Sequence, residues 1–266
     1  MTATITPLLL ARLAGIPGAV ARYGRARPDE MLTVPLFCYL VEPDDGPPIL
    51  FDLGSYDQAE AQRRNKGDVL DHRSPADAVT SAGRDPADIH TVVVSHLHWD
   101  HSVGIRDFPN ARMAVQRDEL RYAFAPNPEH WRPYDSWEGG QDALWREDLD
   151  RIDPVDGHLR LGRDVMLVPT PGHTPGSQSL LVRSDRSYLL CGDLFMGYDN
   201  MPGVTLGDRR IPFRVPPGIH TDLPAWRASV DRIELEGWVP LPAHEPRVTA
   251  VLEEGLTPAE ALGQPC

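Results

Sequence analysis

The stretch VVVSHLHWDHSVG, residues 92–104, decides how this 266-residue chain is interpreted. Three histidines and one aspartate fall within the six positions 96–101, directly after a run of valines. The valines are typical of a buried strand, because β-branched side chains pack well on a pleated sheet. A buried strand does not require histidines at its end, so the polar cluster indicates a binding site.

His96 and His98 are two residues apart, so both side chains can point the same way at a strand exit and share one ion. Asp100 and His101 follow at once, and their natural use is to bind a second ion nearby. Trp99 is too bulky and apolar to be a ligand. The short segment therefore predicts ligands for two neighbouring metal ions.

Three more polar residues each stand at the end of an apolar, strand-like run: His173 in PTPGHTPG, Asp193 in LLCGD and His244 in PLPAHEP. In layered sheet proteins, loops at strand ends carry ligand-binding residues to one rim. Together with the first cluster these residues predict a dinuclear site. Imidazole and carboxylate ligands without thiolates suit catalytic zinc. Without an ion, burying so many polar groups at one point would cost several kcal/mol.

The composition argues against several kinds of partner and location. Asp and Glu number 39 against 26 Lys and Arg, a net charge of −13, and no basic run could follow a phosphate backbone. We expect no nucleic acid and no membrane as partner, because no run reaches the roughly 18–20 apolar residues of a membrane span. Arg12 and Pro17 interrupt the apolar N-terminal stretch, so we expect no signal sequence and a cytoplasmic protein. Cys38 and Cys191 lie in apolar runs and are expected to be buried thiols.

Strand-like runs and helical patterns alternate along the chain. Strands are predicted at 35–41, 47–54, 91–96, 112–116, 164–169, 178–183, 187–193 and 237–244. Helices are predicted at about 75–83, 117–123, 141–149 and 222–235. Two groups of strands with helices between and around them predict an α/β layered sandwich, which we take as one domain over residues 1–266.

Two long segments, 124–145 and 198–220, are rich in proline and aromatic residues. Loops of this length in a compact domain usually act as lids or binding walls. We expect them to wall the site with rigid apolar surface, although some of the aromatics can pack on one another instead. The aromatic side chains concerned are Trp131, Tyr134, Trp137, Trp145 and Phe213.

On these residues the chain resembles the metallo-β-lactamase superfamily, whose H-x-H-x-D-H signature stands here at His96, His98, Asp100 and His101. Within that superfamily it is most similar to the N-acyl homoserine lactonase group of quorum-quenching enzymes. The similarity extends from LTVPLFCYLVEPDDGPPILFDLGS through PTPGHTPGSQSLLV to His244. The resemblance implies a four-layer αββα sandwich with the site at one edge of the two sheets.

The resemblance also divides the ligands between two zinc ions, with iron or manganese as alternatives. One ion would be held by three imidazoles, those of His96, His98 and His173. The other would be held by one carboxylate and two imidazoles, those of Asp100, His101 and His244. Asp193 would bridge the two ions, and Asp52 in FDLGS would orient a histidine from behind.

One position departs from the lactonase pattern. These lactonases place a tyrosine three residues after the bridging aspartate, close to the substrate carbonyl, whereas this chain has Met196 there. The carbonyl oxygen then loses a hydrogen bond worth on the order of 1–3 kcal/mol. Either Tyr198 or His220 supplies another donor, or zinc alone polarises the ester. The preferred substrate is therefore expected to differ from a short-chain acyl homoserine lactone.

The expected reaction is hydrolysis of a small-molecule lactone or ester. Two zinc ions lower the pKa of a shared water from about 16 toward neutrality, and the resulting hydroxide attacks the carbonyl. Asp100 would pass a proton to the leaving alkoxide. Asp193 and the possible donor Tyr198 are the other residues expected to take part in catalysis. Two alternatives stay open: another reaction on this fold, such as thioester hydrolysis of the glyoxalase II type, and a non-catalytic zinc-binding protein. The protein is expected to be a monomer or a homodimer.

Overall fold

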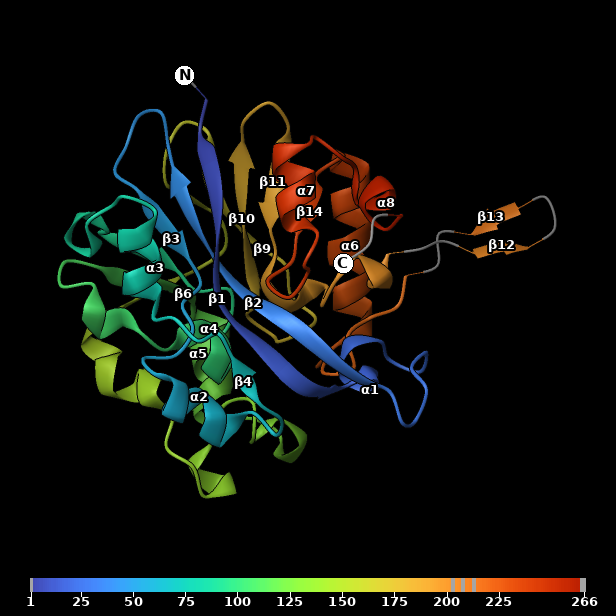
Figure 1. The fold of residues 1–266 in the computed structure, drawn as a ribbon, viewed down its shortest axis with the longest axis horizontal. Helices are drawn as coiled ribbons and strands as arrows, with labels where there is room; N and C mark the ends of the chain where they lie inside the picture. Colours follow the sequence, from blue (N-terminus) through green and yellow to red (C-terminus); the bar gives the residue numbers. More distant parts are fainter. Residues whose placement is uncertain (1, 202–203, 207–208, 212–213, 264–266) are drawn as a thin grey trace.

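The computed structural model describes residues 2–201, 204–206, 209–211 and 214–263. Seven strands belong to one sheet: β1 (Thr4–Pro17), β2 (Met31–Glu42), β3 (Ile49–Phe51), β4 (Val69–Leu70), β5 (Thr91–Val93), β6 (Arg112–Gln116) and β7 (Ile152–Val155). Five belong to a second: β8 (Leu159–Arg160), β9 (Val165–Pro169), β10 (Gln178–Arg183), β11 (Ser187–Leu190) and β14 (Val239–Leu241). A separate hairpin of β12 (Val204–Leu206) and β13 (Arg209–Ile211) extends away from the body (Figure 1).

The α-helices are mostly short. They are α1 (Gly18–Ala21), α2 (Gln58–Arg64), α3 (Pro75–Ser81), α4 (Trp99–Ser102), α5 (Arg117–Phe124), α6 (Leu223–Glu236), α7 (Val248–Glu253) and α8 (Pro258–Ala261). Single 3₁₀ turns lie at Pro86–Asp88, Ile105–Asp107, Pro128–His130, Trp137–Gly139, Gly192–Leu194 and Tyr198–Asn200, with a longer 3₁₀ segment at Leu144–Arg151. The strand order is β4-β1-β2-β3-β5-β6-β7 in the first sheet and β14-β11-β10-β9-β8 in the second.

The two sheets pack face to face, and alternation along their strands builds three apolar layers (Figure 1). In β2, Leu36 and Leu40 pack toward α2, α3 and α5, whereas Phe37 and Tyr39 pack toward the second sheet. In β10, Leu181 packs outward against α6. Successive side chains of a strand point to opposite faces, so each sheet is apolar on both sides. The predicted four-layer αββα sandwich is confirmed.

Two of the predicted strands have the bounds that the structure shows. The predictions at 112–116 and 178–183 coincide with β6 and β10. The predicted helix at 141–149 is wrong, because the chain there forms 3₁₀ turns over Leu144–Arg151 with a non-helical residue at Asp148. The long strand β1 has no counterpart among the predictions. Its hydrophobic alternation is broken by register shifts at Leu9/Ala11 and Leu13/Ile16, so a period-two pattern does not run through it.

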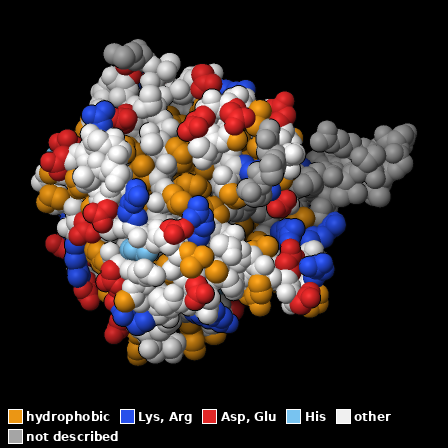
Figure 2. All heavy atoms as spheres, in the orientation of Figure 1, with side chains coloured by type: hydrophobic (Ala, Val, Ile, Leu, Met, Phe, Trp, Pro, Cys, Tyr) orange, Lys and Arg blue, Asp and Glu red, His pale blue; other side chains and the backbone are white. Residues whose placement is uncertain are grey.

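Two further findings concern the helices and the cysteines of the described residues. Among them, no helix is both long enough and apolar enough to cross a membrane. Cys38 and Cys191 are buried free thiols, as predicted, and Cys266 lies outside the described residues. On the face shown in Figure 2, Lys and Arg side chains of the described residues lie scattered among Asp and Glu rather than in a continuous stripe.

Candidate metal centre

Seven polar side chains meet where strands of both sheets end. Among the described residues they form two groups: His96, His98, His173 and Asp193, and Asp100, His101 and His244. All stand in turns or single helical turns that follow β5, β9, β11 or β14. The structure thus brings together every ligand that the sequence predicts, from positions up to 148 residues apart, 244 minus 96.

The first group, without its aspartate, is here called the imidazole half: His96, His98 and His173. His173 Nε2 lies 3.2 Å from His96 Nε2 and 3.3 Å from His98 Nδ1. Burial holds the pKa of His96 and His98 well below the ordinary value, and lowers the pKa of His173 to about 4. All three rings are therefore neutral at pH 7 and present lone pairs to a common point.

The second group is here called the carboxylate half: Asp100, His101 and His244. Asp100 lies 3.8 Å from His101 Nε2 and 3.6 Å from His244 Nε2. Burial lowers the pKa of His101, but the charges of Asp193, Asp100 and Asp52 raise it more, so the net shift is upward. The same balance raises the pKa of His244.

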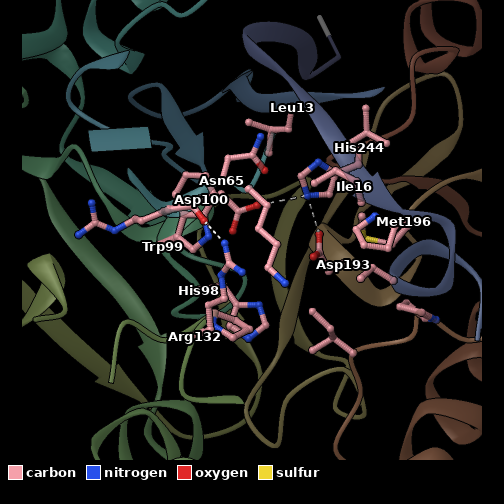
Figure 3. Close-up of a pocket in the computed structure, with 18 of the residues that line it drawn as sticks. Leu13, Ile16, Asn65, His98, Trp99, Asp100, Arg132, Asp193, Met196 and His244 are labelled. Atoms are coloured by element: carbon pink, nitrogen blue, oxygen red, sulfur yellow. Dashed lines mark hydrogen bonds and ion pairs between the residues drawn. The ribbon is translucent and has the colours of Figure 1, made fainter. Parts of the chain in front are cut away.

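Asp193 faces both halves. Its Oδ2 lies 3.6 Å from His173 Nε2, and its Oδ1 lies 3.2 Å from His101 Nε2 and 3.3 Å from His244 Nε2. Figure 3 shows Asp193 directed toward His244. Asp193 is buried, with 7% of its accessible surface exposed. This is the position that a carboxylate bridging two cations requires.

The donor set fits a pair of divalent cations. Facing ring nitrogens of neutral histidines cannot all be satisfied by one another, because each neutral ring has only one N–H. Within the described part of the chain, His101 Nε2 and Asp193 Oδ1 are buried and lie 3.2 Å apart, but neither has a partner in hydrogen-bond alignment. Orphaned buried polar atoms are costly, and ions held by imidazole and carboxylate groups would satisfy them.

Comparison with known proteins assigns the family. A family model described as the metallo-beta-lactamase superfamily matches residues 33–244. The chain belongs to the metallo-β-lactamase superfamily. An N-acyl homoserine lactonase from Bacillus sp is 31% identical over 172 residues, which is 60% of this chain and 63% of that relative. N-acyl homoserine lactonase AttM from Azorhizobium caulinodans is 41% identical over 119 residues, 41% of each chain. The chain therefore matches less than two thirds of the length of these relatives.

Solved structures share the fold over almost the whole chain. A Bacillus thuringiensis AiiA variant with N-decanoyl-L-homoserine bound at its active site has a TM-score of 0.67 at 23% identity, covering 94% of this chain and 96% of the other. A probable metal-dependent hydrolase from Staphylococcus aureus has a TM-score of 0.71 at 17% identity, covering 92% and 90%. At these identities the similarity establishes the metallo-β-lactamase fold of the chain.

Three candidate histidine ligands, His101, His173 and His244, are each contacted at Nδ1 by an oxygen atom of another residue. His101 Nδ1 lies 2.9 Å from Asp52 Oδ2, as the sequence predicts for Asp52. His173 Nδ1 lies 2.8 Å from the Ile219 carbonyl, and His244 Nδ1 lies 2.8 Å from the Pro35 carbonyl. Such contacts fix the tautomer, so that Nε2 is left to face the metal position.

Glu119 is an important residue that the sequence interpretation missed. Its fully buried carboxylate accepts hydrogen bonds from Leu97 N at 2.8 Å and Tyr134 Oη at 2.7 Å through Oε1, and from Thr174 Oγ1 at 2.6 Å through Oε2. Leu97 and Thr174 belong to the two ligand-bearing turns of the imidazole half, and the Tyr134 ring packs edge-on against His98. One carboxylate thus ties three segments together.

A weak signal for Glu119 exists in the sequence. It precedes Ala123 by four residues, so both fall on the same face of α5, and that face is buried. An acid on the buried face of a helix needs several donors, because desolvation of an unpaired carboxylate is costly. The sequence cannot show where those donors come from.

A cavity of about 280 Å³ opens beside the candidate ligands. Met196 lines it, so the position expected to hold the lactonase tyrosine does face the cavity. Tyr198 does not: its ring is fully buried and its hydroxyl donates to the Pro240 carbonyl at 3.2 Å. The prediction that Tyr198 supplies a substitute donor is wrong, because two residues further along the chain the 3₁₀ turn points inward to the core between the sheets.

The other predicted donor and the predicted aromatic wall are also absent from the lining. His220 Nδ1 lies 2.8 Å from the Pro217 carbonyl, and its ring packs against Tyr23. Tyr134 and Trp145 are buried in the core, Trp137 is exposed, and Trp131 Nε1 donates to the Pro126 carbonyl. Phe213 lies outside the described residues. Tyr134 and Trp145 therefore serve packing. The two segments still reach the site through other residues, because Glu129, Arg132, Pro217 and Ile219 line the cavity.

Proposed function

We propose that this chain is a metal-dependent hydrolase that opens a lactone or ester, with two zinc ions as its resident metals. The observation that supports the proposal is the pair of candidate ligand groups that both face Asp193 beside a cavity. The similarity to lactonases from Bacillus sp and Azorhizobium caulinodans supports the substrate class. Two zinc ions, when bound, would polarise the carbonyl and provide a water of lowered pKa.

The residues of the chain divide the remaining work. The histidines of both halves and Asp193 would hold the ions. Asp100 is the most exposed of the candidate ligands, with a side-chain exposure of 15%, and it lines the cavity. We propose that it transfers a proton to the leaving alkoxide, because its carboxylate lies at the cavity that would hold the substrate.

Met196 makes the site differ from that of the resembling lactonases. It lines the cavity and has no hydrogen-bond donor, and no tyrosine of the described chain stands in its place in the lining. The carbonyl oxygen would then depend on the metal alone for stabilisation. We therefore propose that the preferred substrate is not a short-chain acyl homoserine lactone.

The experiment is a hydrolysis screen of the zinc-loaded protein. The panel comprises γ-lactones, acyl homoserine lactones of short and long chain, aryl esters, a glutathione thioester and a β-lactam. We expect turnover of lactones or esters that is lost after chelation and restored by zinc. Preferred turnover of the thioester would overturn the substrate class, and a fully metallated protein that turns over none of them would indicate a non-catalytic zinc-binding protein.

Three further points stay predictions. They are that residues 1–266 form one domain, that the protein is a monomer or homodimer, and that it is cytoplasmic. Limited proteolysis, light scattering after size-exclusion chromatography, and cell fractionation are the respective measurements.

A further inference from the structure

The cavity beside the metal centre has two unlike walls. One is apolar and comes from β1, α1, β2 and the segment before α6: Leu13, Ile16, Pro17, Val20, Val34, Pro217 and Ile219. The other is polar and comes from the end of α2 and from the segment after α5: Arg64, Asn65, Lys66, Glu129 and Arg132. Figure 3 shows Arg132 and Trp99 on one side of the cavity and Met196 and His244 on the other.

Part of the polar wall is used by the fold itself. Arg64 forms ion pairs with Glu60 and Asp135. The Asn65 side-chain amide donates to the Ala14 carbonyl at 3.0 Å. These two side chains are therefore committed to holding α2 against β1 and the neighbouring loop.

Lys66 and Arg132 are not committed in this way. Arg132 donates to the Arg64 carbonyl at 2.8 Å, and within the described residues it forms no ion pair. Lys66 is exposed and has no recorded hydrogen bond or ion pair with any described residue. By contrast, surface arginines elsewhere pair with acids, as Arg112 does with Asp153.

The backbone around Lys66 is held in place beside the cavity by hydrogen bonds and packing against β1. Asn65 before it is buried and bonded to β1, as above, and Ala14 N donates to the Asp68 carbonyl at 2.9 Å. A Cβ added to Gly67 would lie 2.2 Å from the Ala14 carbonyl oxygen, so the loop touches β1 directly. The lysine therefore projects from a fixed base, although its side chain is long.

The charge of this wall is unusual for the molecule. Lys66 is the only lysine in the sequence, and the chain as a whole carries a net charge of −13. On the wall the two uncommitted cations face one acid, Glu129. A positive wall beside a metal centre attracts anions, and a concave site strengthens that attraction.

We propose that Lys66 and Arg132 form a subsite for a carboxylate group of the substrate. This carboxylate is remote from the scissile ester bond. The preferred substrate is then an anionic lactone or ester, whose carbon skeleton lies against the apolar wall. This inference rests on the proposed function and adds the substrate class to it. An ionic anchor of this kind would orient a substrate for which Met196 offers no hydrogen bond.

The first experiment compares two γ-lactones that differ in one group, a side chain ending in a carboxylate or in the matching primary amide. We expect the zinc-loaded protein to prefer the carboxylate in kcat/KM by about tenfold, the size of one charge-assisted hydrogen bond. Lys66→Met should bring this ratio close to one, and Lys66→Arg should retain most of it. The preference should also fall with added salt.

The matched control is Arg63→Met. It removes the same unit of charge from the same helix end, but Arg63 is exposed, pairs with Glu60 and is absent from the cavity lining. This variant should keep the ratio of the unaltered protein. The subsite is overturned if the unaltered protein has equal kcat/KM for the two lactones. It is also overturned if Lys66→Met does not change the ratio of the two kcat/KM values. In both cases the proposed lactone hydrolysis stands.

A second experiment does not depend on turnover. Because the chain has one lysine, reductive methylation can modify one side-chain amine, which mass spectrometry distinguishes from the terminal amine. We expect the ring-opened dicarboxylate to protect Lys66 at concentrations at which the ring-opened amide does not. If neither lactone is hydrolysed, the proposed function fails, and the protection of Lys66 still tests the subsite. Equal modification of Lys66 in the presence of the two compounds overturns the subsite.

Discussion

The two halves of the candidate metal centre differ in the chemistry of their side chains. The imidazole half consists of three buried rings that are neutral at pH 7, because burial lowers the pKa of each. The carboxylate half contains rings whose pKa is raised by neighbouring acids, so without metal it is internally compensated by ion pairs. The first half needs a cation to satisfy its lone pairs, whereas the second has to lose protons before a cation can bind.

Their supports differ as well. The imidazole half depends on Glu119, which gathers its two ligand turns from one side. In the carboxylate half, His101 is held by Asp52 and His244 by a backbone carbonyl of β2. Single substitutions can therefore be chosen that affect both halves or only one of them.

Asp193→Asn should have the largest effect, because this residue faces both halves. We expect the metal content to fall from two ions per chain to at most one, and lactone or ester turnover to fall by on the order of 1,000-fold. Elemental analysis of metal-replete protein and steady-state kinetics are the measurements. A variant that keeps both ions and full turnover would show that Asp193 is no bridge.

Asp100→Asn tests the carboxylate half alone. An amide can still donate an oxygen to a cation, but it cannot transfer a proton. We expect most of the metal to remain and kcat to fall by about 100-fold or more. Wild-type turnover in a variant that binds two ions would remove the proton-transfer role from Asp100.

Thr174→Val tests the imidazole half alone. It removes one of the hydrogen bonds to Glu119, so that the turn carrying His173 is held less firmly. We expect the zinc affinity of this half to fall by about tenfold, measured by competition with a chelator, and the affinity of the carboxylate half to stay.

The matched control for that variant is Thr170→Val. Its hydroxyl is equally buried and lies near the same turn, but it pairs with Ser179 rather than with Glu119. Equal losses of zinc affinity in the two variants would mean that any buried hydroxyl near the turn matters, and that Glu119 has no special part.

The smallest expected effect is a difference between the two halves in how metal affinity depends on pH. Neighbouring acids raise the pKa of His101 and His244, so these rings keep their protons to higher pH than the rings of the imidazole half. A cation that binds the carboxylate half has to displace those protons. Affinity of the carboxylate half should therefore rise with pH across neutrality. Affinity of the imidazole half should stay flat and decline only as pH falls toward about 4, the pKa of His173.

The measurement is proton release on zinc binding, by calorimetry in two buffers of different ionisation enthalpy. His244→Ala leaves the imidazole half intact, and His173→Ala leaves the carboxylate half intact. We expect about one proton more to be released per zinc in His173→Ala than in His244→Ala. Equal release from the two variants would contradict the different protonation of the halves.

The sequence by itself determined the class of fold and the identity of the candidate ligands. Apolar runs that end in His or Asp identify strands and their polar ends, because backbone pairing and side-chain burial both act within a few residues. The seven ligands could be predicted since a dense set of imidazoles and carboxylates after buried strands has few other uses. Asp52 could be predicted only through the family resemblance.

Only the tertiary structure decided the parts that depend on distant segments. Strand β1 escaped prediction because its bulges break the period of two, and its place is fixed by pairing with β2 and β4. Tyr198 lies two residues from Met196, yet one faces the core and the other the cavity, because the direction of a side chain in a 3₁₀ turn is set by packing. Glu119 and Lys66 acquire their surroundings from turns far away in sequence. Such contacts leave no local pattern, since their free energy comes from groups that only the folded chain brings together.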